Sequence, residues 1–143
     1  MSSLIAYTDG ACKSNPGPGG WGVLIIDGEE RRELYGGERV TTNNRMELTA
    51  AIEALKNSNI SRDIVIYADS KYVIDGITKW LPNWVRRGWK TADNKAVKNV
   101  DLWQLLHAQV ANRNVEWRWV RGHDGDFGNE RADQLANIGV ASL

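Results

Sequence analysis

Hydrophobic and polar positions along the chain follow two periods, one typical of strands and one typical of helices. Short apolar and β-branched runs near residues 4–8, 20–26, 31–37, 64–69 and 115–120 predict strands, and a turn at Asp27-Gly28 joins the second and third into a hairpin. Apolar residues at helical spacing predict helices over about 42–58, 70–80 and 100–111, and from about 129 to the end of the chain. A hairpin followed by β-α-β units indicates an α/β domain with a mixed sheet flanked by helices.

Length and composition narrow the class of protein. The 143 residues, 42% hydrophobic and 25% charged, predict one globular domain spanning residues 1–143. The N-terminal stretch does not have the pattern of a signal peptide, and no apolar run reaches the roughly 20 residues of a membrane span, so we expect no membrane partner. Cys12 is the only cysteine, which excludes an internal disulfide and a thiolate zinc site and favours a cytoplasmic protein.

The net charge is zero, but the charges are segregated. Residues 79–98, with the sequence KWLPNWVRRGWKTADNKAVK, hold six basic residues against Asp93 alone, a net charge of +5. Trp80, Trp84 and Trp89 alternate with these cations, a pattern typical of a nucleic-acid-binding groove. The alternative is a helical hairpin with a solvated basic face, whose tryptophans pack in the core at helical spacing.

Two strands that are predicted to be buried each end at an aspartate. The segment LIAYTDG places Asp9 after its apolar run, and IVIYADS places Asp69 in the same way. The crevice beyond the carboxyl ends of strands is where open α/β sheets bind ligands. The structural alternative is that Asp69 caps the helix that starts near Ser70 and that Asp9 forms a turn with Gly10.

Two further acidic residues lie near predicted helix starts. Glu47 follows Asn44 by three positions and precedes Leu48 on the apolar stripe, where an unpaired carboxylate is costly. Asp133 lies near the start of the last helix. The structural alternatives are a capping box for Glu47 and an interaction with the helix dipole for Asp133. Four carboxylates at one sheet edge would repel one another without cations, and their hard oxygen ligands suit Mg²⁺ or Mn²⁺.

Five motifs cover nearly the whole chain in order and resemble the bacterial type I ribonuclease H family: YTDGACKSNPGPGGWG, TTNNRMELTAAIEAL, YADSKYVIDGITKW, NWVRRGWKTADNKAVKNVDLW and WVRGHDGDFGNERADQLA. The resemblance implies a five-stranded mixed sheet with helices on both faces. It also implies endonucleolytic cleavage of the RNA strand of RNA–DNA hybrids, leaving 5′-phosphate and 3′-hydroxyl ends. The acidic metal ligands of the family fall on Asp9, Glu47, Asp69 and Asp133, and its mobile-loop histidine falls on His123.

The chemistry of phosphodiester hydrolysis suits this residue set. Two divalent ions, Mg²⁺ or Mn²⁺ as a substitute, can activate water and stabilise the leaving oxygen, so the protein need not supply a nucleophile. We expect Asp9 and Asp69 to be central ligands, with Glu47 on one ion and Asp133 on the other. We expect His123 to move protons or to help the product leave.

The resemblance also implies residues that bind the hybrid. Asn15, Asn43 and Asn44 match asparagines that contact the minor groove, and Thr42 matches a residue of a DNA-phosphate pocket. The basic segment corresponds to a protrusion over about 80–98, here called the handle. Contacts to phosphates and 2′-hydroxyls predict cleavage that is largely independent of sequence. The substrate-binding set is completed by Lys71, Trp80, Trp84, Arg86, Arg87 and Lys90.

Two positions depart from the bacterial pattern. Lys71 stands where glutamine is common, and Asp124-Gly125-Asp126 follows His123 where the family commonly has Ala-Gly. Asp124 and Asp126 would favour a protonated His123, or would remain solvated in their loop.

Two other functions stay open. One is a non-catalytic nucleic-acid-binding module on the same fold, which the four intact carboxylates disfavour. The other is the ribonuclease H domain of a reverse transcriptase. From the starting methionine and the lack of a separate domain before Ser3, we expect a free-standing, monomeric enzyme without an obligatory protein partner.

Overall fold

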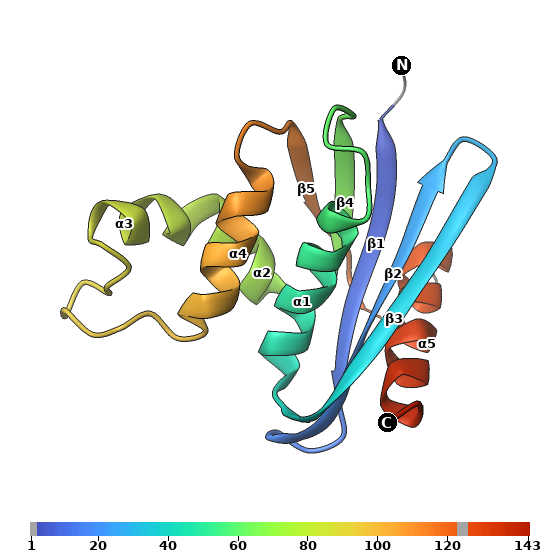
Figure 1. Ribbon diagram of the computed structural model, residues 1–143, viewed down its shortest axis with the longest axis horizontal. Helices are drawn as coiled ribbons and strands as arrows, with labels where there is room; N and C mark the ends of the chain where they lie inside the picture. Colours follow the sequence, from blue (N-terminus) through green and yellow to red (C-terminus); the bar gives the residue numbers. More distant parts are fainter. Residues whose placement is uncertain (1–2, 123–125) are drawn as a thin grey trace.

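A five-stranded mixed sheet forms the centre of the molecule (Figure 1). The computed structural model describes residues 3–122 and 126–143. The strands are β1 (Leu4–Cys12), β2 (Gly17–Asp27), β3 (Glu30–Thr41), β4 (Ile64–Ala68) and β5 (Val115–Trp119). Their order is β3-β2-β1-β4-β5, with antiparallel pairing from β3 to β1 and parallel pairing from β1 to β5. The predicted five-stranded mixed sheet is confirmed.

The first three strands are longer than the apolar runs that predicted them. β2 begins at Gly17 and β3 continues to Thr41, and these two residues pair with each other. Backbone pairing in an antiparallel ladder does not need apolar side chains, so the glycine-rich and polar flanks join the strands. The predicted hairpin turn is present, and Gly28 has a φ of 62°, which glycine adopts without steric cost.

Five α-helices and one π-helical turn accompany the sheet in the described part of the chain. They are α1 (Asn43–Lys56), α2 (Lys71–Asp75), the π-helical turn η1 (Gly76–Trp80), α3 (Leu81–Arg86), α4 (Val100–Val110) and α5 (Phe127–Ala141). The helix predicted over 70–80 is therefore not uniform, because its second half is π-helical. None of the helices described here has the length and apolar character that crossing a membrane requires.

The helices cover the two faces of the sheet unequally. α1 and α4 lie on one face, and Figure 1 shows α5 on the other, behind β2 and β3. The buried core on the first face joins α1, α4 and the sheet through Leu48, Leu55, Ile66, Trp103 and Leu106. The apolar stripe predicted for the helix after residue 42 is therefore its core-facing side.

The handle projects from the body next to α4 (Figure 1). It consists of α3 and a loop that folds back through a bridge between Lys90 and Ala96. The alternative of a helical hairpin is wrong, because only one arm is helical. Leu81 and Val97 are buried at its base, so the handle is anchored to the core while its basic side chains are exposed.

Candidate active site

The strand register brings Asp9 and Asp69 together. β1 and β4 are parallel, and Thr8 pairs with Ala68. Asp9 and Asp69 directly follow these two residues, so they lie at the same level of the sheet. Asp69 follows the last residue of β4, as predicted. Asp9, however, lies inside β1 and pairs with Gly22 of β2, so the expectation that it ends its strand is wrong. Antiparallel pairing with β2 carries β1 past the point where β4 stops.

The structural alternatives for these aspartates are not observed. Ser70, not Asp69, is the N-cap of α2, and its hydroxyl accepts a hydrogen bond from the amide of Val73. The carboxylate of Asp9 does accept a hydrogen bond from the amide of Gly10, at 2.9 Å, but within a strand and not in a turn. Helix capping therefore leaves the Asp69 carboxylate available for other ligands.

Glu47 reaches the same place from α1. Thr42 is the N-cap of α1 and accepts from the amide of Arg45, so Glu47 lies beyond the capping-box position and the capping-box alternative is wrong. A Cβ atom at Gly10 would lie only 2.5 Å from the amide nitrogen of Glu47, so α1 and β1 are in backbone contact there. The amide of Gly10 donates a hydrogen bond to Oε1 of Glu47. The glycine thus allows the close approach that places this carboxylate beside Asp9.

Asp133 comes from the opposite face of the sheet. A Cβ atom at Gly22, the pairing partner of Asp9, would lie 2.3 Å from the carbonyl oxygen of Ala132, so α5 lies directly on the backbone of β2. This contact brings Asp133 to the side of Asp9. Asp133 is in the second turn of α5, and the acidic residue of the first turn is Glu130. Because the helix dipole acts mainly on the first turn, it gives Asp133 little stabilisation.

The four carboxylates surround one cavity. One carboxylate oxygen from each of Asp9, Glu47 and Asp69 lies within 4.8 Å of the other two. Asp133, Gly10, Asn43 and Ser70 complete the lining of a cavity of about 300 Å³, here called the carboxylate cavity. Asp9 and Glu47 are buried, with 6% and 5% of their surface exposed, whereas Asp69 and Asp133 are half-buried.

The electrostatics of this cavity are those of a cation site. Burial raises the pKa of Asp9, and the negative charges of Glu47 and Asp69 raise it further. Burial also raises the pKa of Glu47, although hydrogen bonds from Asp9 and from the amide of Gly10 oppose this effect. Across residues 3–122 and 126–143, none of the ion pairs includes any of the four carboxylates. Hard oxygen ligands without a basic partner fit a divalent cation such as Mg²⁺ or Mn²⁺.

The predicted groove-contacting residues lie at the rim of the carboxylate cavity. Asn43 lines it, and the amide of Asn43 donates to Oδ1 of Asn15 at 3.0 Å, which holds the loop before β2 against the start of α1. Asn44 is exposed at the same helix start. Thr42 uses its hydroxyl to cap α1. The four side chains therefore lie together at the start of α1, beside the carboxylate cavity.

The handle residues divide into an exposed and a packed group. Arg86, Arg87 and Lys90 are exposed, and Trp80 is 38% exposed. Trp84 instead packs edge-to-face on the buried Trp103, with 5.2 Å between ring centroids. Core packing, the alternative considered for these tryptophans, is therefore present at Trp84.

The remaining predicted residues either lie outside the described part of the chain or have partners away from the carboxylate cavity. His123 and Asp124 lie outside the described residues. Asp126 is the N-cap of α5 and accepts from the amide of Asn129 at 2.9 Å, so its carboxylate has a structural partner. The Lys71 ammonium lies over the ring of Trp119, 4.6 Å from its centroid.

Sequence reasoning missed a network that joins α1 to α4. The guanidinium of Arg45 binds both carboxylate oxygens of Asp101, at 3.0 and 2.8 Å. Asn99 donates to the hydroxyl of Tyr72, and the indole of Trp103 donates to the same hydroxyl at 3.0 Å. These partners are far apart along the chain, so no local spacing could have revealed them.

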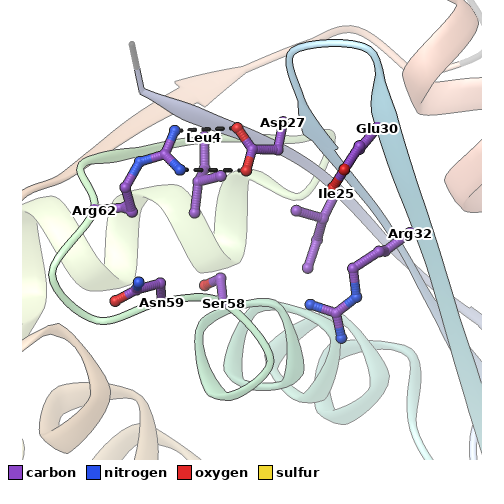
Figure 2. Close-up of a pocket in the computed structure, with 8 residues that line it drawn as sticks. All are labelled: Leu4, Ile25, Asp27, Glu30, Arg32, Ser58, Asn59 and Arg62. Atoms are coloured by element: carbon purple, nitrogen blue, oxygen red, sulfur yellow. Dashed lines mark hydrogen bonds and ion pairs between the residues drawn. The ribbon is translucent and has the colours of Figure 1, made fainter. Parts of the chain in front are cut away.

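A second cavity lies at the opposite end of the sheet and differs in character (Figure 2). It has a volume of about 260 Å³ and is lined by Leu4, Ile25, Asp27, Glu30, Arg32, Ser58, Asn59 and Arg62. Figure 2 shows the guanidinium of Arg62 facing the carboxylate of Asp27, with both hydrogen bonds at 3.2 Å. Opposite charges neutralise each other here, so the clustered like charges of the carboxylate cavity have no counterpart at this end.

Comparison with known proteins identifies the family. The sequence model of the RNase H family matches residues 1–141. Ribonuclease HI of Pseudomonas aeruginosa is 64% identical over 140 residues, covering 98% of this chain and 95% of that protein. Ribonuclease H of Alcanivorax borkumensis is 59% identical over 143 residues, covering 100% of this chain and 95% of that protein.

Solved structures agree with this assignment. LC9-RNase H1, a type 1 RNase H with the type 2 active-site motif, superposes with a TM-score of 0.86 at 37% identity, over 99% of this chain and 74% of that chain. LC11-RNase H1, solved in complex with an RNA/DNA hybrid, shares the fold with a TM-score of 0.74 at 23% identity, over 98% of each chain. With a family match that spans almost the whole sequence, the chain belongs to the ribonuclease H family of nucleases.

Proposed function

We propose that this protein is an endoribonuclease that hydrolyses the RNA strand of RNA–DNA hybrids, acting through a single catalytic domain over residues 1–143 with the handle as its basic protrusion. The observation that supports this most is the carboxylate cavity of a ribonuclease H family member, in which Asp9, Glu47 and Asp69 have oxygens within 4.8 Å of one another. Clustered carboxylates without a basic partner are costly unless cations bind them.

Asp9, Glu47, Asp69 and Asp133 would hold two divalent ions, Mg²⁺ or Mn²⁺ as a substitute. When bound, these ions would supply an activated water and stabilise the charge on the leaving oxygen. The buried pair Asp9 and Glu47 would release its protons to solvent on binding cations, and the close β1–α1 backbone contact at Gly10 holds both carboxylates in place. Attack by water on the scissile phosphate with departure of the 3′-oxygen gives 5′-phosphate and 3′-hydroxyl ends.

The rim residues would hold the hybrid over the cavity. Asn15, Asn43 and Asn44 lie where they can meet a groove, with Thr42 beside them for a phosphate of the DNA strand. Reading of 2′-hydroxyls and groove width distinguishes RNA from DNA without reading base sequence.

The handle would bind the backbone through charge. Arg86, Arg87 and Lys90 are exposed cations, and Trp80 offers a flat apolar surface next to them. Lys71 and Trp84 complete the proposed contact set, with Trp84 supporting Trp80 at 5.9 Å between ring centroids. His123 would move a proton or help the product leave. We further propose that the enzyme works as a cytoplasmic monomer without an obligatory protein partner.

The test is cleavage of three labelled duplexes of the same sequence, an RNA–DNA hybrid, an RNA duplex and a DNA duplex, with Mg²⁺ and with EDTA. The proposal expects cleavage of the RNA strand of the hybrid alone, and only with Mg²⁺. Product ends are read by their sensitivity to phosphatase and by ligation. Tight hybrid binding without cleavage in Mg²⁺ would instead indicate a non-catalytic binding module.

A further inference from the structure

The indole of Trp119 contacts the backbone of Asp69. Trp119 is the last residue of β5, pairs with Ala68 and is 42% exposed, which is unusual for a tryptophan in a strand. Its ring nitrogen donates a hydrogen bond to the carbonyl oxygen of Asp69, at 3.1 Å. A side chain of the edge strand therefore holds the peptide group of a proposed metal ligand.

This hydrogen bond lies where the sheet no longer holds the chain. The amide of Val120 donates to the carbonyl of Ala68 at 2.9 Å, and β4 ends at that residue. The carbonyl of Asp69 lies beyond the ladder, and a side chain takes the place of a neighbouring strand. In the segment that follows β5, a Cβ atom at Gly122 would lie 2.9 Å from Oδ2 of Asp69. The backbone after β5 therefore also lies against the Asp69 carboxylate.

Lys71 holds the indole from the other side. Its ammonium lies 4.6 Å from the centroid of the Trp119 ring, a cation–π distance. Lys71 is the first residue of α2, directly after the N-cap Ser70. The ring thus contacts both ends of the short junction that runs from Asp69 to Lys71.

Asp69 has more need of such a support than its two neighbours. Asp9 and Glu47 are buried within β1 and α1, whereas Asp69 is half-buried at the end of a five-residue strand. Groups that hydrogen-bond around metal ligands fix the orientation of those ligands, and their loss typically lowers metal affinity about 10- to 100-fold.

We propose that Trp119 is a positioning residue that fixes Asp69 for divalent-cation binding, with Lys71 holding the indole in place. This inference rests on the proposed function, because it takes Asp69 as a metal ligand. Trp119 does not contact the reacting atoms; it acts through the peptide group of Asp69.

The deciding variant is Trp119→Phe, which keeps an aromatic ring next to Lys71 and removes the N–H donor together with part of the indole surface. Calorimetric titration of the full chain with MgCl₂ and with MnCl₂ measures the affinity, and thermal melting in EDTA measures folding. We expect affinity to fall about tenfold, with the melting temperature in EDTA unchanged. Lys71→Met, which keeps the indole and removes the cation, should give a smaller loss.

Trp117→Phe is the matched control. Trp117 lies two positions earlier on β5, pairs with Ile66 and packs against the core, and the indole hydrogen bond to Asp69 comes from Trp119. Loss of affinity in Trp119→Phe but not in Trp117→Phe supports the inference. Equal affinities of Trp119→Phe and wild type, or equal losses in both tryptophan variants, would overturn it. A wild-type protein that binds neither ion and leaves the hybrid intact would contradict the proposed function itself.

Discussion

The carboxylate cavity and the handle differ in the sign of their charges and in how far those charges are exposed to solvent. The cavity brings like charges together in a partly buried space, where Asp9 and Glu47 are 6% and 5% exposed. The handle spreads basic side chains over a projecting surface, where Arg86, Arg87 and Lys90 are all exposed. One region is positioned by strand register and backbone contact, and the other is held to the core by apolar side chains such as Leu81, Trp84 and Val97.

This difference separates the two tasks of a nuclease. Buried, like-charged ligands create a strong demand for cations and tolerate little movement, which suits bond cleavage. Exposed cations in solvent give attraction that is long-ranged, dependent on salt and tolerant of small displacements, which suits binding of a duplex of any sequence. Changes in the cavity should therefore affect turnover, and changes in the handle should affect binding.

The largest effect is expected for Asp69→Asn. The substitution keeps the shape of the side chain and removes its charge, so cation-dependent stabilisation worth several kcal/mol is lost and cleavage of the hybrid should fall by at least about 10³-fold. Single-turnover cleavage in Mg²⁺ measures the rate, and circular dichroism checks the fold. Asp75→Asn, on the α2 helix and paired with Lys79, is the surface control and should retain normal activity. A folded Asp69→Asn protein with a near-normal cleavage rate would contradict the proposed role of Asp69 as a metal ligand.

The next effect is expected in the handle. Replacement of Arg86, Arg87 and Lys90 by glutamine should raise KM for the hybrid and leave kcat nearly unchanged. Each lost phosphate contact should flatten the dependence of log affinity on log salt by about 0.9, so the triple variant should change that slope by up to about 2.7. Binding measured at several salt concentrations gives the slope.

Lys56→Gln serves as the charge control for the handle variant, because Lys56 ends α1 at the far end of the sheet. It should leave both KM and the salt slope unchanged. If the triple variant lowers kcat while KM and the salt slope stay at their wild-type values, the handle is not the electrostatic surface proposed here.

A pH effect should follow from the raised pKa values of Asp9 and Glu47. Cations bind the ionised carboxylates, so below the raised pKa each binding event must displace protons, and the affinity for Mg²⁺ rises with pH. At limiting Mg²⁺, the affinity should therefore increase about tenfold per pH unit for each proton displaced. Titration calorimetry in buffers of different ionisation enthalpy counts the protons released. An affinity that does not vary between about pH 6 and pH 8 would contradict the shifted ionisation.

The smallest effect is expected at the link between α1 and α4. The Arg45 guanidinium holds the pKa of Asp101 in the folded protein below its usual value. The pair therefore stabilises the fold at pH values above the pKa of Asp101 in the unfolded chain. This contribution is lost as the pH falls through the lower pKa of the folded protein. Since 61% of the Asp101 side chain is exposed, Asp101→Asn should cost only about 0.5 kcal/mol at pH 7. Urea denaturation at pH 7 and at a series of pH values below about 4 measures the difference, which should shrink as the pH falls through the folded pKa of Asp101. A loss of equal size at all these pH values would show that charge is not its source.

Much of the fold was predictable because it depends on local periodicity. The strand near 64–69 was visible as an apolar run, and its direction parallel to β1 follows from the β3-α1-β4 order, although its place beside β1 does not. The cation site was also predictable in outline, since carboxylates next to apolar positions have few structural uses. Family membership, predicted from five motifs, is confirmed by the match over residues 1–141.

What could not be predicted depends on contacts between distant segments. The position of Asp9 within β1 depends on pairing with Gly22, and the exclusion of a capping role for Glu47 depends on Thr42 taking the cap. The support of Asp69 by Trp119 requires the β4–β5 register, which no spacing encodes. The role of His123 stays a prediction.

The central claim is that the carboxylate cavity exists to bind divalent cations, and thermal melting of wild type and Asp9→Asn tests it most directly. Because the pKa of Asp9 is raised in the folded state, its ionisation costs stability increasingly as the pH rises above the unfolded value of about 4. At pH 8 in EDTA, Asp9→Asn should therefore melt higher than wild type.

Mg²⁺ should reverse that order. Binding to the folded state stabilises wild type by mass action, by about 3 °C or more at saturating Mg²⁺, whereas Asp9→Asn should gain little because one ligand is missing. A wild-type melting temperature that is the same in Mg²⁺ and in EDTA, or an equal gain in both proteins, would contradict the claim.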